Sequence, residues 1–309
     1  MSNISFYGHG KLMLTSEYFA LEGAKVLTIP VQFGQHLRVK ELSGESNTLY
    51  WVALDHLKQP WLHLTFDKQT LQCINTDSKE ARILTQMLQQ ARLMNPSFLS
   101  GYNDIAVETS LEFPNEWGLG TSSTLVYCLS AWAGVDGVAL LHATMGGSGY
   151  DVAVAGSDTP IVYTLIDGRA TWEQVHFLPP FAEQLYFAYT GKKVTSSTSI
   201  ASYRDRIKGN KDAVTWLTKL TDSMLQSQTL DKMEQIIREH EAIVSEALQT
   251  PTIKSQLFPD YWGEVKSLGA WGGDFVLLTH RGDEEELLFY LKRKDISIVM
   301  RYDKMLWNN

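Results

Sequence analysis

A glycine-rich segment at residues 114–126, PNEWGLGTSSTLV, has the residue types of an anion-binding turn. Gly118 and Gly120 permit backbone conformations and a close ligand approach that a Cβ would prevent. The hydroxyl residues 121–123 follow where a helix would begin, and the first N–H groups of a helix bind phosphate well. The same pattern is found in an ordinary capped helix, because Ser and Thr are favoured N-caps. Both interpretations stay open from the segment alone.

Two charged residues and one polar segment could act beside such a turn. Lys11 ends a strand-like stretch, where a lysine is more often solvated. Asp151 follows Gly146-Gly147-Ser148-Gly149-Tyr150, where an aspartate is more often a turn residue or a cap than a base. Segment 190–199, TGKKVTSSTS, could bind a carboxylate or phosphate through its lysines and hydroxyls, or could be a solvated loop.

Hydrophobic periodicity predicts the elements that must position these residues. Predicted strands cover 4–14, 26–31, 35–39, 105–111, 161–165, 184–189, 275–279 and 296–300. Predicted helices cover the region of 83–91 and residues 122–133, 138–145, 230–248 and 284–291. Strands and helices interleaved in this way indicate an α+β fold. The segment Phe177-Leu178-Pro179-Pro180 is the expected domain boundary.

Composition excludes several classes of protein. The 309 residues are 44% hydrophobic and 20% charged, as in a soluble globular protein. A net charge of −8 argues against nucleic-acid binding but not against a small anionic substrate. No apolar run approaches the ~20 residues of a membrane span, so no membrane partner is expected. With two cysteines, neither a disulfide framework nor a thiolate zinc cluster is available, and a cytoplasmic location is expected.

Four motifs, in the right order, resemble those of the galactokinase–homoserine kinase–mevalonate kinase–phosphomevalonate kinase (GHMP) superfamily. The first resembles a strand-end lysine followed by G-E-H/Y-x-V-x-x-G, and it matches at Lys11, Glu17, Tyr18 and Gly23, with Ser16 where glycine is usual. The second resembles P-x-x-x-G-L-G-S-S-A and matches at Pro114, Gly118, Leu119, Gly120, Thr121, Ser122 and Ser123.

The third motif, at 146–155, resembles G-x-x-S-G-x-D of mevalonate kinases and G-S-G-F-D-V-S of phosphomevalonate kinases. Asp151 takes the place of the aspartate credited with activating the substrate hydroxyl. The fourth, at 267–277, is similar to G-A-G-x-G-G, with Trp271 in place of a glycine. Gly269, Ala270, Gly272, Gly273 and Asp274 follow the phosphomevalonate kinase form, G-A-G-G-G-D. Taken alone, this segment is a turn that opens the next strand.

The resemblance implies a GHMP kinase fold, with an N-terminal ribosomal-protein-S5-domain-2-like α/β sandwich at 1–179 and a C-terminal ferredoxin-like domain at 180–309. It implies ATP and Mg²⁺ as cofactors and an ATP-dependent phosphotransferase. Lys11 and Asp151 would be catalytic, and Ser122 would contact the metal. The residues that would bind the cofactor are Gly118, Leu119, Gly120, Thr121, Ser122 and Ser123. Those that would bind the substrate are Glu17, Tyr18, Ser148, Lys192, Lys193, Ser197, Gly272 and Gly273.

The chain departs from the family at one position that matters for the metal. Mevalonate kinases carry a glutamate one helix before the aspartate, and the corresponding position here is Leu140 or a neighbour. His142 is the nearest polar group, and Asp136 would serve only with a rearranged connection.

The details of the third and fourth motifs indicate a mevalonate-pathway acceptor, phosphomevalonate or mevalonate. A diphosphomevalonate decarboxylase, a sugar or homoserine kinase of the same fold, and a non-catalytic ligand-binding regulator remain alternatives. The expected partners are ATP and a small anionic substrate. The sequence leaves the oligomeric state undecided, and a homodimer stays open.

Overall fold

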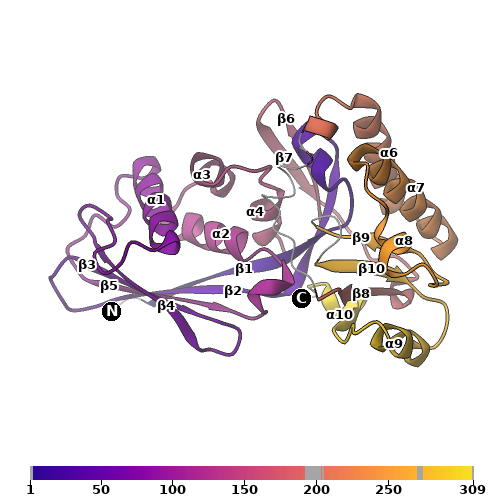
Figure 1. The fold of residues 1–309 in the computed structure, drawn as a ribbon. Helices are drawn as coiled ribbons and strands as arrows, with labels where there is room; N and C mark the ends of the chain where they lie inside the picture. Colours follow the sequence, from indigo (N-terminus) through magenta and orange to yellow (C-terminus); the bar gives the residue numbers. More distant parts are fainter. Residues whose placement is uncertain (1–2, 192–202, 204, 270–273, 308–309) are drawn as a thin grey trace. The chain divides into compact units, whose positions relative to one another are not determined.

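The computed structural model describes residues 3–191, 203, 205–269 and 274–307 (Figure 1). The chain forms two compact units, each built from separate stretches of sequence. Unit 1 contains Met1–Gly10, Phe33–Asn115 and Leu119–Gly156, and unit 2 contains Lys11–Gln32, Glu116–Gly118 and Ser157–Asn309. These units are interleaved along the chain, and the contiguous domains 1–179 and 180–309 stay a prediction.

Groups of strands and groups of helices are interleaved along the chain. The strands are β1 (Asn3–Met13), β2 (Val26–Glu41), β3 (Thr48–Leu54), β4 (Pro60–Asp67), β5 (Ile105–Leu111), β6 (Ile161–Ile166), β7 (Arg169–Gln174), β8 (Leu185–Tyr189), β9 (Val265–Ser267), β10 (Phe275–Thr279) and β11 (Val299–Arg301). The α-helices are α1 (Lys79–Met94), α2 (Thr121–Ala133), α3 (Gly137–Thr144), α4 (Tyr150–Ala155), α6 (Lys211–Leu225), α7 (Leu230–Leu248), α8 (Ile253–Leu257), α9 (Glu284–Lys292) and α10 (Tyr302–Met305). Short 3₁₀ helices are η1 (Tyr18–Glu22), η2 (Asn115–Trp117) and η3 (Ala182–Gln184).

Unit 1 is a sheet covered by helices. Its strands lie in the order β4-β3-β5-β2, with β3 parallel to β5 and the other neighbours antiparallel. Alternate residues of β3 are buried, as expected for a strand with one covered face. Figure 1 shows helices α1 to α4 over this sheet, and α2 contacts both α3 and α4. The glycine-rich turns of the second and third motifs therefore begin two packed helices of one unit.

Unit 2 contains a second, entirely antiparallel sheet in the order β11-β8-β10-β9. Its two central strands, β8 and β10, are buried at every residue. Helix α9 packs on this sheet through a cluster that contains Tyr186, Val276, Leu287 and Leu291. The N-terminal part of β2 pairs with β6, and β6 pairs with β7, in the same unit.

Helices α6 and α7 of unit 2 contact each other and lie side by side in Figure 1. A second apolar cluster joins these helices to η1 through Tyr18, Phe19, Leu217 and Val244, among others. Helix η1, in the segment of the first motif, therefore packs against α6 and α7. Glu17 and Tyr18, at the start of this packed segment, are both buried.

The α+β class predicted from the sequence is confirmed, with some differences in the strands. Residues 26–31 and 35–39 were expected as two strands, but they belong to one strand, β2. Gly34 lies within this strand and does not interrupt it. A Cβ at this position would lie 2.4 Å from the carbonyl oxygen of Gly8, so glycine permits a close approach of the two backbones. Strands β3, β4, β7 and β9 were not predicted.

Among the described residues, no single helix has the length and apolarity of a membrane span. Helices α2 and α3 reach these values only together, and the chain bends by 119° between them.

Candidate functional site

The glycine-rich turn at 118–120 leads directly into α2. Gly118 and Gly120 both have positive φ, at 70° and 96°, a region in which L side chains are strained. Gly120 is the N-cap of α2 and has no side chain to cap it. The first N–H groups of such a helix have no partner within the helix and lie at the positive end of its dipole. This local geometry favours the anion-binding interpretation over that of a helix capped by a side chain.

The hydroxyl residues after the turn differ in their surroundings. Ser122 is exposed. Ser123 is buried and its hydroxyl donates to the carbonyl oxygen of Gly120 at 2.8 Å. Thr124 is also buried, and its hydroxyl donates to Gln35 Oε1 at 2.7 Å, which attaches α2 to β2 within unit 1. Ser122 is therefore the serine of this turn whose side chain faces solvent.

Lys11 lies near the end of β1 in unit 2, and only 8% of it is exposed. Its Nζ donates to the carbonyl oxygen of Gly118 at 3.2 Å. Lys11 is therefore a buried lysine that contacts the glycine-rich turn, and the alternative of a solvated strand-end lysine does not describe it.

Asp274 is a residue of this region that the sequence analysis matched to a motif but did not assign to the site. It has φ 55°, unusual for a residue other than glycine, and it is 7% exposed. A Cβ on Gly118 would lie 2.6 Å from Asp274 Cγ, so only glycine fits there. The backbone N–H and the hydroxyl of Thr190 donate to the carbonyl oxygen of Asp274 at 2.9 and 3.0 Å. The sequence signal was its position directly after Gly272-Gly273.

Asp151 is in the first turn of α4, which begins after Gly149 with φ 91°. The Asp151 side chain is partly exposed, and its Oδ1 accepts from the Val152 N–H at 3.1 Å. Ser148 is also partly exposed. Helix α4 contacts α2 within unit 1, so the third motif and the start of α2 belong to one packed body.

The side chains around α3 answer the question of the missing metal carboxylate. Leu140 is fully buried, and His142 is exposed. Asp136 caps α3, because its Oδ1 accepts from the Ala139 N–H at 2.6 Å. In the described part of the chain, no group of three or more His, Cys, Asp and Glu side chains could hold a metal ion.

Glu17 and Tyr18, predicted as substrate residues, are both buried in unit 2. Tyr18 packs edge-on against the ring of Tyr203, with centroids 5.3 Å apart. The Glu17 carboxylate forms an ion pair with Lys266 of β9, and both side chains are almost completely enclosed. Neither residue is exposed to a ligand in this structure, and their assignment to substrate stays a prediction.

Two further ionisable residues, His240 and Glu241 of α7, complete a buried polar cluster around Glu17. Lys266 Nζ lies 3.4 Å from Glu241 Oε1, and His240 Nε2 lies 3.4 Å from Glu17 Oε2. Burial raises the pKa of the Glu17 carboxyl, and the ion pair with Lys266 opposes this shift. Burial holds the pKa of His240 well below its usual value, with the Lys266 charge adding to the effect. His240 is therefore neutral.

Glu241 shares the single cation of this cluster with Glu17. Burial raises the pKa of Glu241 to about 8, with Lys266 opposing the shift and Glu17 reinforcing it. Two carboxylates beside one buried lysine cannot both be ionised without a large cost. We therefore take Glu17 as the ionised partner of Lys266 and Glu241 as the protonated acid at neutral pH.

Five residues predicted to bind substrate lie outside the described residues: Lys192, Lys193, Ser197, Gly272 and Gly273. Their roles stay predictions.

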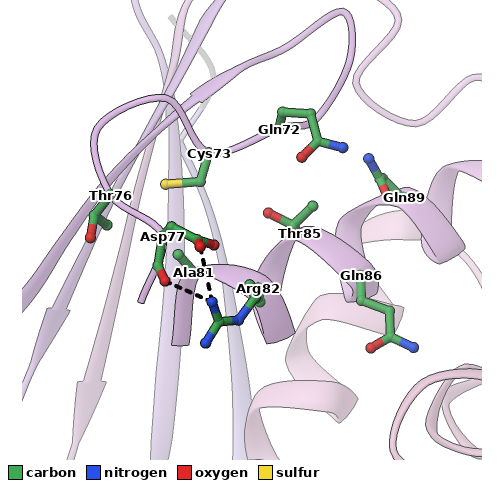
Figure 2. Close-up of a pocket in the computed structure, with 9 residues that line it drawn as sticks. All are labelled: Gln72, Cys73, Thr76, Asp77, Ala81, Arg82, Thr85, Gln86 and Gln89. Atoms are coloured by element: carbon green, nitrogen blue, oxygen red, sulfur yellow. Dashed lines mark hydrogen bonds and ion pairs between the residues drawn. The ribbon is translucent and has the colours of Figure 1, made fainter. Parts of the chain in front are cut away.

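A separate hollow of about 400 Å³ lies in unit 1, between α1 and the loop that follows β4 (Figure 2). Its lining residues are mainly polar: Gln72, Cys73, Thr76, Asp77, Ala81, Arg82, Thr85, Gln86 and Gln89. Its one cation, Arg82, is paired with Asp77 at 3.0 Å, as Figure 2 shows. No residue of the four motifs lines this hollow, and the sequence analysis did not single it out.

These residues fit a nucleotide better than they fit a protein-bound metal centre. The uncapped start of α2 and the exposed Ser122 hydroxyl suit phosphate oxygens and a metal ion that these oxygens carry. Mg²⁺ in such sites keeps several waters and takes one or two carboxylates together with substrate phosphates. Ser122 would hold the ion together with the nucleotide, and Leu140 supplies no carboxylate.

Comparison with known proteins gives matches at the level of structure. No protein-family model and no curated protein sequence matches the chain. Mevalonate kinase of Methanococcus jannaschii is similar with a TM-score of 0.69 at 14% identity, over 100% of this chain and 99% of that one. Phosphomevalonate kinase of Streptococcus pneumoniae, in complex with phosphomevalonate and AMPPNP, has a TM-score of 0.71 at 16% identity, over 96% and 99%.

Galactokinase of Lactococcus lactis, in complex with galactose, is similar with a TM-score of 0.68 at 12% identity, over 95% of this chain and 89% of that one. These structures represent several members of the GHMP kinases. The chain has the GHMP kinase fold over nearly its full length, which confirms the fold predicted from the motifs.

The contact of Gly118 with Asp274 predicts the effect of adding a methyl group there. Gly118→Ala should lower the free energy of unfolding by about 2 kcal/mol or more, because a left-handed conformation costs ~1–2 kcal/mol for L-residues and the Cβ also collides with the carboxylate. Gly101→Ala is the matched control, since no atom lies within 4 Å of its added Cβ and its φ is not positive. Urea unfolding measures both. Equal stability of the two variants would contradict the described geometry.

The protonation of Glu241 predicts how stability depends on pH. Between pH 6.5 and about 8 the unfolded chain has lost this proton while the folded chain keeps it, so stability falls as pH rises. Over that window the wild type should lose about 2 kcal/mol, at 1.36 kcal/mol per pH unit. His240 opposes this loss only slightly: it is neutral in the folded protein, and the unfolded imidazole, with an ordinary pKa of 6.5, is half protonated at pH 6.5 and almost neutral at pH 8.

Glu241→Gln mimics the protonated acid and should remove this loss, whereas Glu239→Gln, on the exposed side of α7, should retain it. Urea unfolding at a series of pH values provides the measurement. A wild-type stability that is flat from pH 6.5 to 8 would show that Glu241 is ionised in the folded protein.

Proposed function

We propose that this chain is an ATP-dependent small-molecule kinase. It transfers the γ-phosphoryl group of Mg·ATP to a hydroxyl or phosphate of a mevalonate-pathway acceptor, phosphomevalonate or mevalonate. The observation that carries this proposal is the Gly118–Gly120 turn, which ends in an uncapped helix and is contacted by the buried Lys11. The full-length GHMP kinase fold supports it.

The backbone N–H groups at the start of α2 would bind the ATP phosphates, and Ser122 would add its hydroxyl. When bound, Mg²⁺ neutralises phosphate charge and orients the phosphate oxygens. Glycine at 118 and 120 lets the backbone approach these oxygens closely. The buried hydroxyls of Ser123 and Thr124 would fix the position of α2, and Ser123 would bind the phosphates through its backbone N–H.

Lys11 and Asp151 have different roles in the proposed transfer. The acceptor oxygen attacks the γ-phosphorus, the bond from that phosphorus to the bridging oxygen breaks, and ADP leaves. Asp151 accepts or orients the proton of the acceptor hydroxyl. Lys11 neutralises negative charge near the transferred phosphoryl group. Such a reaction depends mainly on positioning and charge stabilisation rather than on covalent catalysis.

The acceptor is proposed to be small and anionic. The structure of the S. pneumoniae phosphomevalonate kinase is in complex with phosphomevalonate. The residue patterns of the third and fourth motifs favour the same class of acceptor here. Lys192, Lys193 and Ser197 would bind its carboxylate or phosphate. Residues Ser148, Gly272 and Gly273 would line the same site, and we expect the enzyme to act in the cytoplasm.

An ADP-release assay with Mg·ATP tests the proposal directly. Mevalonate and phosphomevalonate are offered separately to the wild type, to Asp151→Asn and to Asp212→Asn. We expect turnover with one acceptor and a loss of about 10²–10⁴-fold in Asp151→Asn, the usual contribution of a general acid–base group. Asp212, an exposed residue of the first turn of α6, provides the control and should leave turnover unchanged.

Other outcomes separate the alternatives. Turnover that requires diphosphomevalonate and releases carbon dioxide would identify a decarboxylase, and turnover with galactose or homoserine would identify another kinase of this fold. No turnover with any acceptor, together with stabilisation by the ligands, would indicate a non-catalytic regulator and contradict the kinase proposal.

A further inference from the structure

The buried cluster of Glu17, His240, Glu241 and Lys266 calls for a physical explanation beyond stability. Their side chains are between 0% and 5% exposed. Glu17 Oε2, His240 Nδ1 and Glu241 Oε2 accept or donate no hydrogen bond within the described residues. Buried polar atoms of this kind are costly, and a buried ion pair seldom stabilises a fold more than apolar residues would. The cluster is therefore better explained by what it holds in place.

Lys266 joins two segments that are 249 residues apart in sequence. Its Nζ donates a hydrogen bond to the Glu17 carboxylate and another to the carbonyl oxygen of Ser267, the latter at 3.0 Å. Lys266 is the middle residue of β9, and it is paired with Leu277 of β10. Its side chain therefore connects the end of the first motif to the strand that precedes the fourth.

His240 holds the residue immediately before Glu17. Ser16 has φ 65° and is completely buried, so its backbone is in a conformation that favours glycine. Its N–H donates to His240 Nε2 at 2.8 Å, which requires the neutral tautomer with the proton on Nδ1. The neutral state of His240 agrees with its burial. This bond explains how serine can occupy a position where the family motif has glycine.

A closed series of contacts leads from this cluster to Lys11. Glu17 lies six residues after Lys11, and Lys266 connects Glu17 to β9. Strand β9 pairs with β10, whose first residue follows Asp274. The Asp274 carboxylate lies against Gly118, and the Gly118 carbonyl accepts from Lys11. All of these contacts belong to unit 2.

We propose that Lys266 is a positioning residue, which holds Lys11 against the Gly118 turn through its ion pair with Glu17. Lys266 itself, with no exposed surface, touches no ligand. The ion pair fixes the segment 11–17 to β9, and its loss frees the Glu17 end of this segment to shift. In Lys266→Met the Glu17 carboxylate is also left buried without a cation. Lys11, at the other end of this segment, then leaves the Gly118 carbonyl. The effect of Lys266 on catalysis rests on the proposed kinase function, whereas its effect on the position of Lys11 does not.

The reactivity of the Lys11 amine tests this proposal without any substrate. Folded Lys266→Met is treated with an acetylating ester, and the rate of Lys11 acetylation is followed by peptide mass spectrometry. We expect Lys11 to react several-fold faster than in the wild type, because it has lost its enclosure. Lys254→Met is the matched control, since it removes a partly exposed lysine paired with Glu264 at 3.1 Å and should leave Lys11 protected.

A folded Lys266→Met in which Lys11 is as protected as in the wild type would overturn the proposal. If Lys266→Met does not fold, Glu17→Gln removes the same ion pair with little change of shape, and the same increase is expected. Protection of Lys11 in that variant would also overturn it.

Kinetics then separate a positioning role from a general loss of stability. In an active enzyme, kcat of Lys266→Met should fall about tenfold or more through misplacement of Lys11, with KM for the acceptor unchanged. An unchanged kcat would overturn the proposal. Absence of turnover in the wild type would reject the kinase function, and the acetylation of Lys11 would still decide the role of Lys266.

Discussion

The left-handed backbone of Gly118 is the constraint on which the described part of the site depends. A side chain at this position would collide with the Asp274 carboxylate, so only glycine lets these two segments meet. The same backbone conformation presents the Gly118 carbonyl to Lys11. Two residues later Gly120 begins α2 without a side-chain cap. One short turn therefore places a cation and leaves a helix N-terminus available for an anion.

Unit 2 contains a group of ionisable side chains that are buried together. The cluster around Lys266 contains two carboxyl groups, one imidazole and one cation, all enclosed. Neutralising Glu241 by protonation and keeping His240 neutral leaves one ion pair, between Lys266 and Glu17. This ion pair joins the segment of the first motif to the strand that precedes the fourth. In the role proposed for Lys266, this ion pair holds the buried Lys11 against the Gly118 carbonyl.

Much of the fold could be predicted from local patterns. Helix α7 at Leu230–Leu248 and strand β5 at Ile105–Leu111 were predicted residue for residue, because their apolar periodicity is strong. Strands β3 and β4 were missed, although their alternation is present in the sequence. The motifs indicated the GHMP kinase fold at a sequence identity of 12–16% to the solved relatives, since glycine positions in turns are constrained by backbone geometry.

The contacts between distant segments could not be predicted in the same way. Periodicity gives the face of an element but not its partner, so nothing in the sequence connects Glu17 with Lys266. The role of Ser123 in binding the cofactor stays a prediction, and the sequence did not show that its hydroxyl donates to the Gly120 carbonyl within the turn. Asp274 was recognised as part of a motif, and its contact with Gly118 became visible only in three dimensions.

The central claim is that the turn before α2 binds the phosphates of a magnesium nucleotide. Isothermal titration of the wild-type chain with AMPPNP, in the presence of Mg²⁺ and in the presence of EDTA, tests it most directly. The account predicts one nucleotide bound per chain, with clearly higher affinity when Mg²⁺ is present. No binding at millimolar nucleotide in either condition would contradict it.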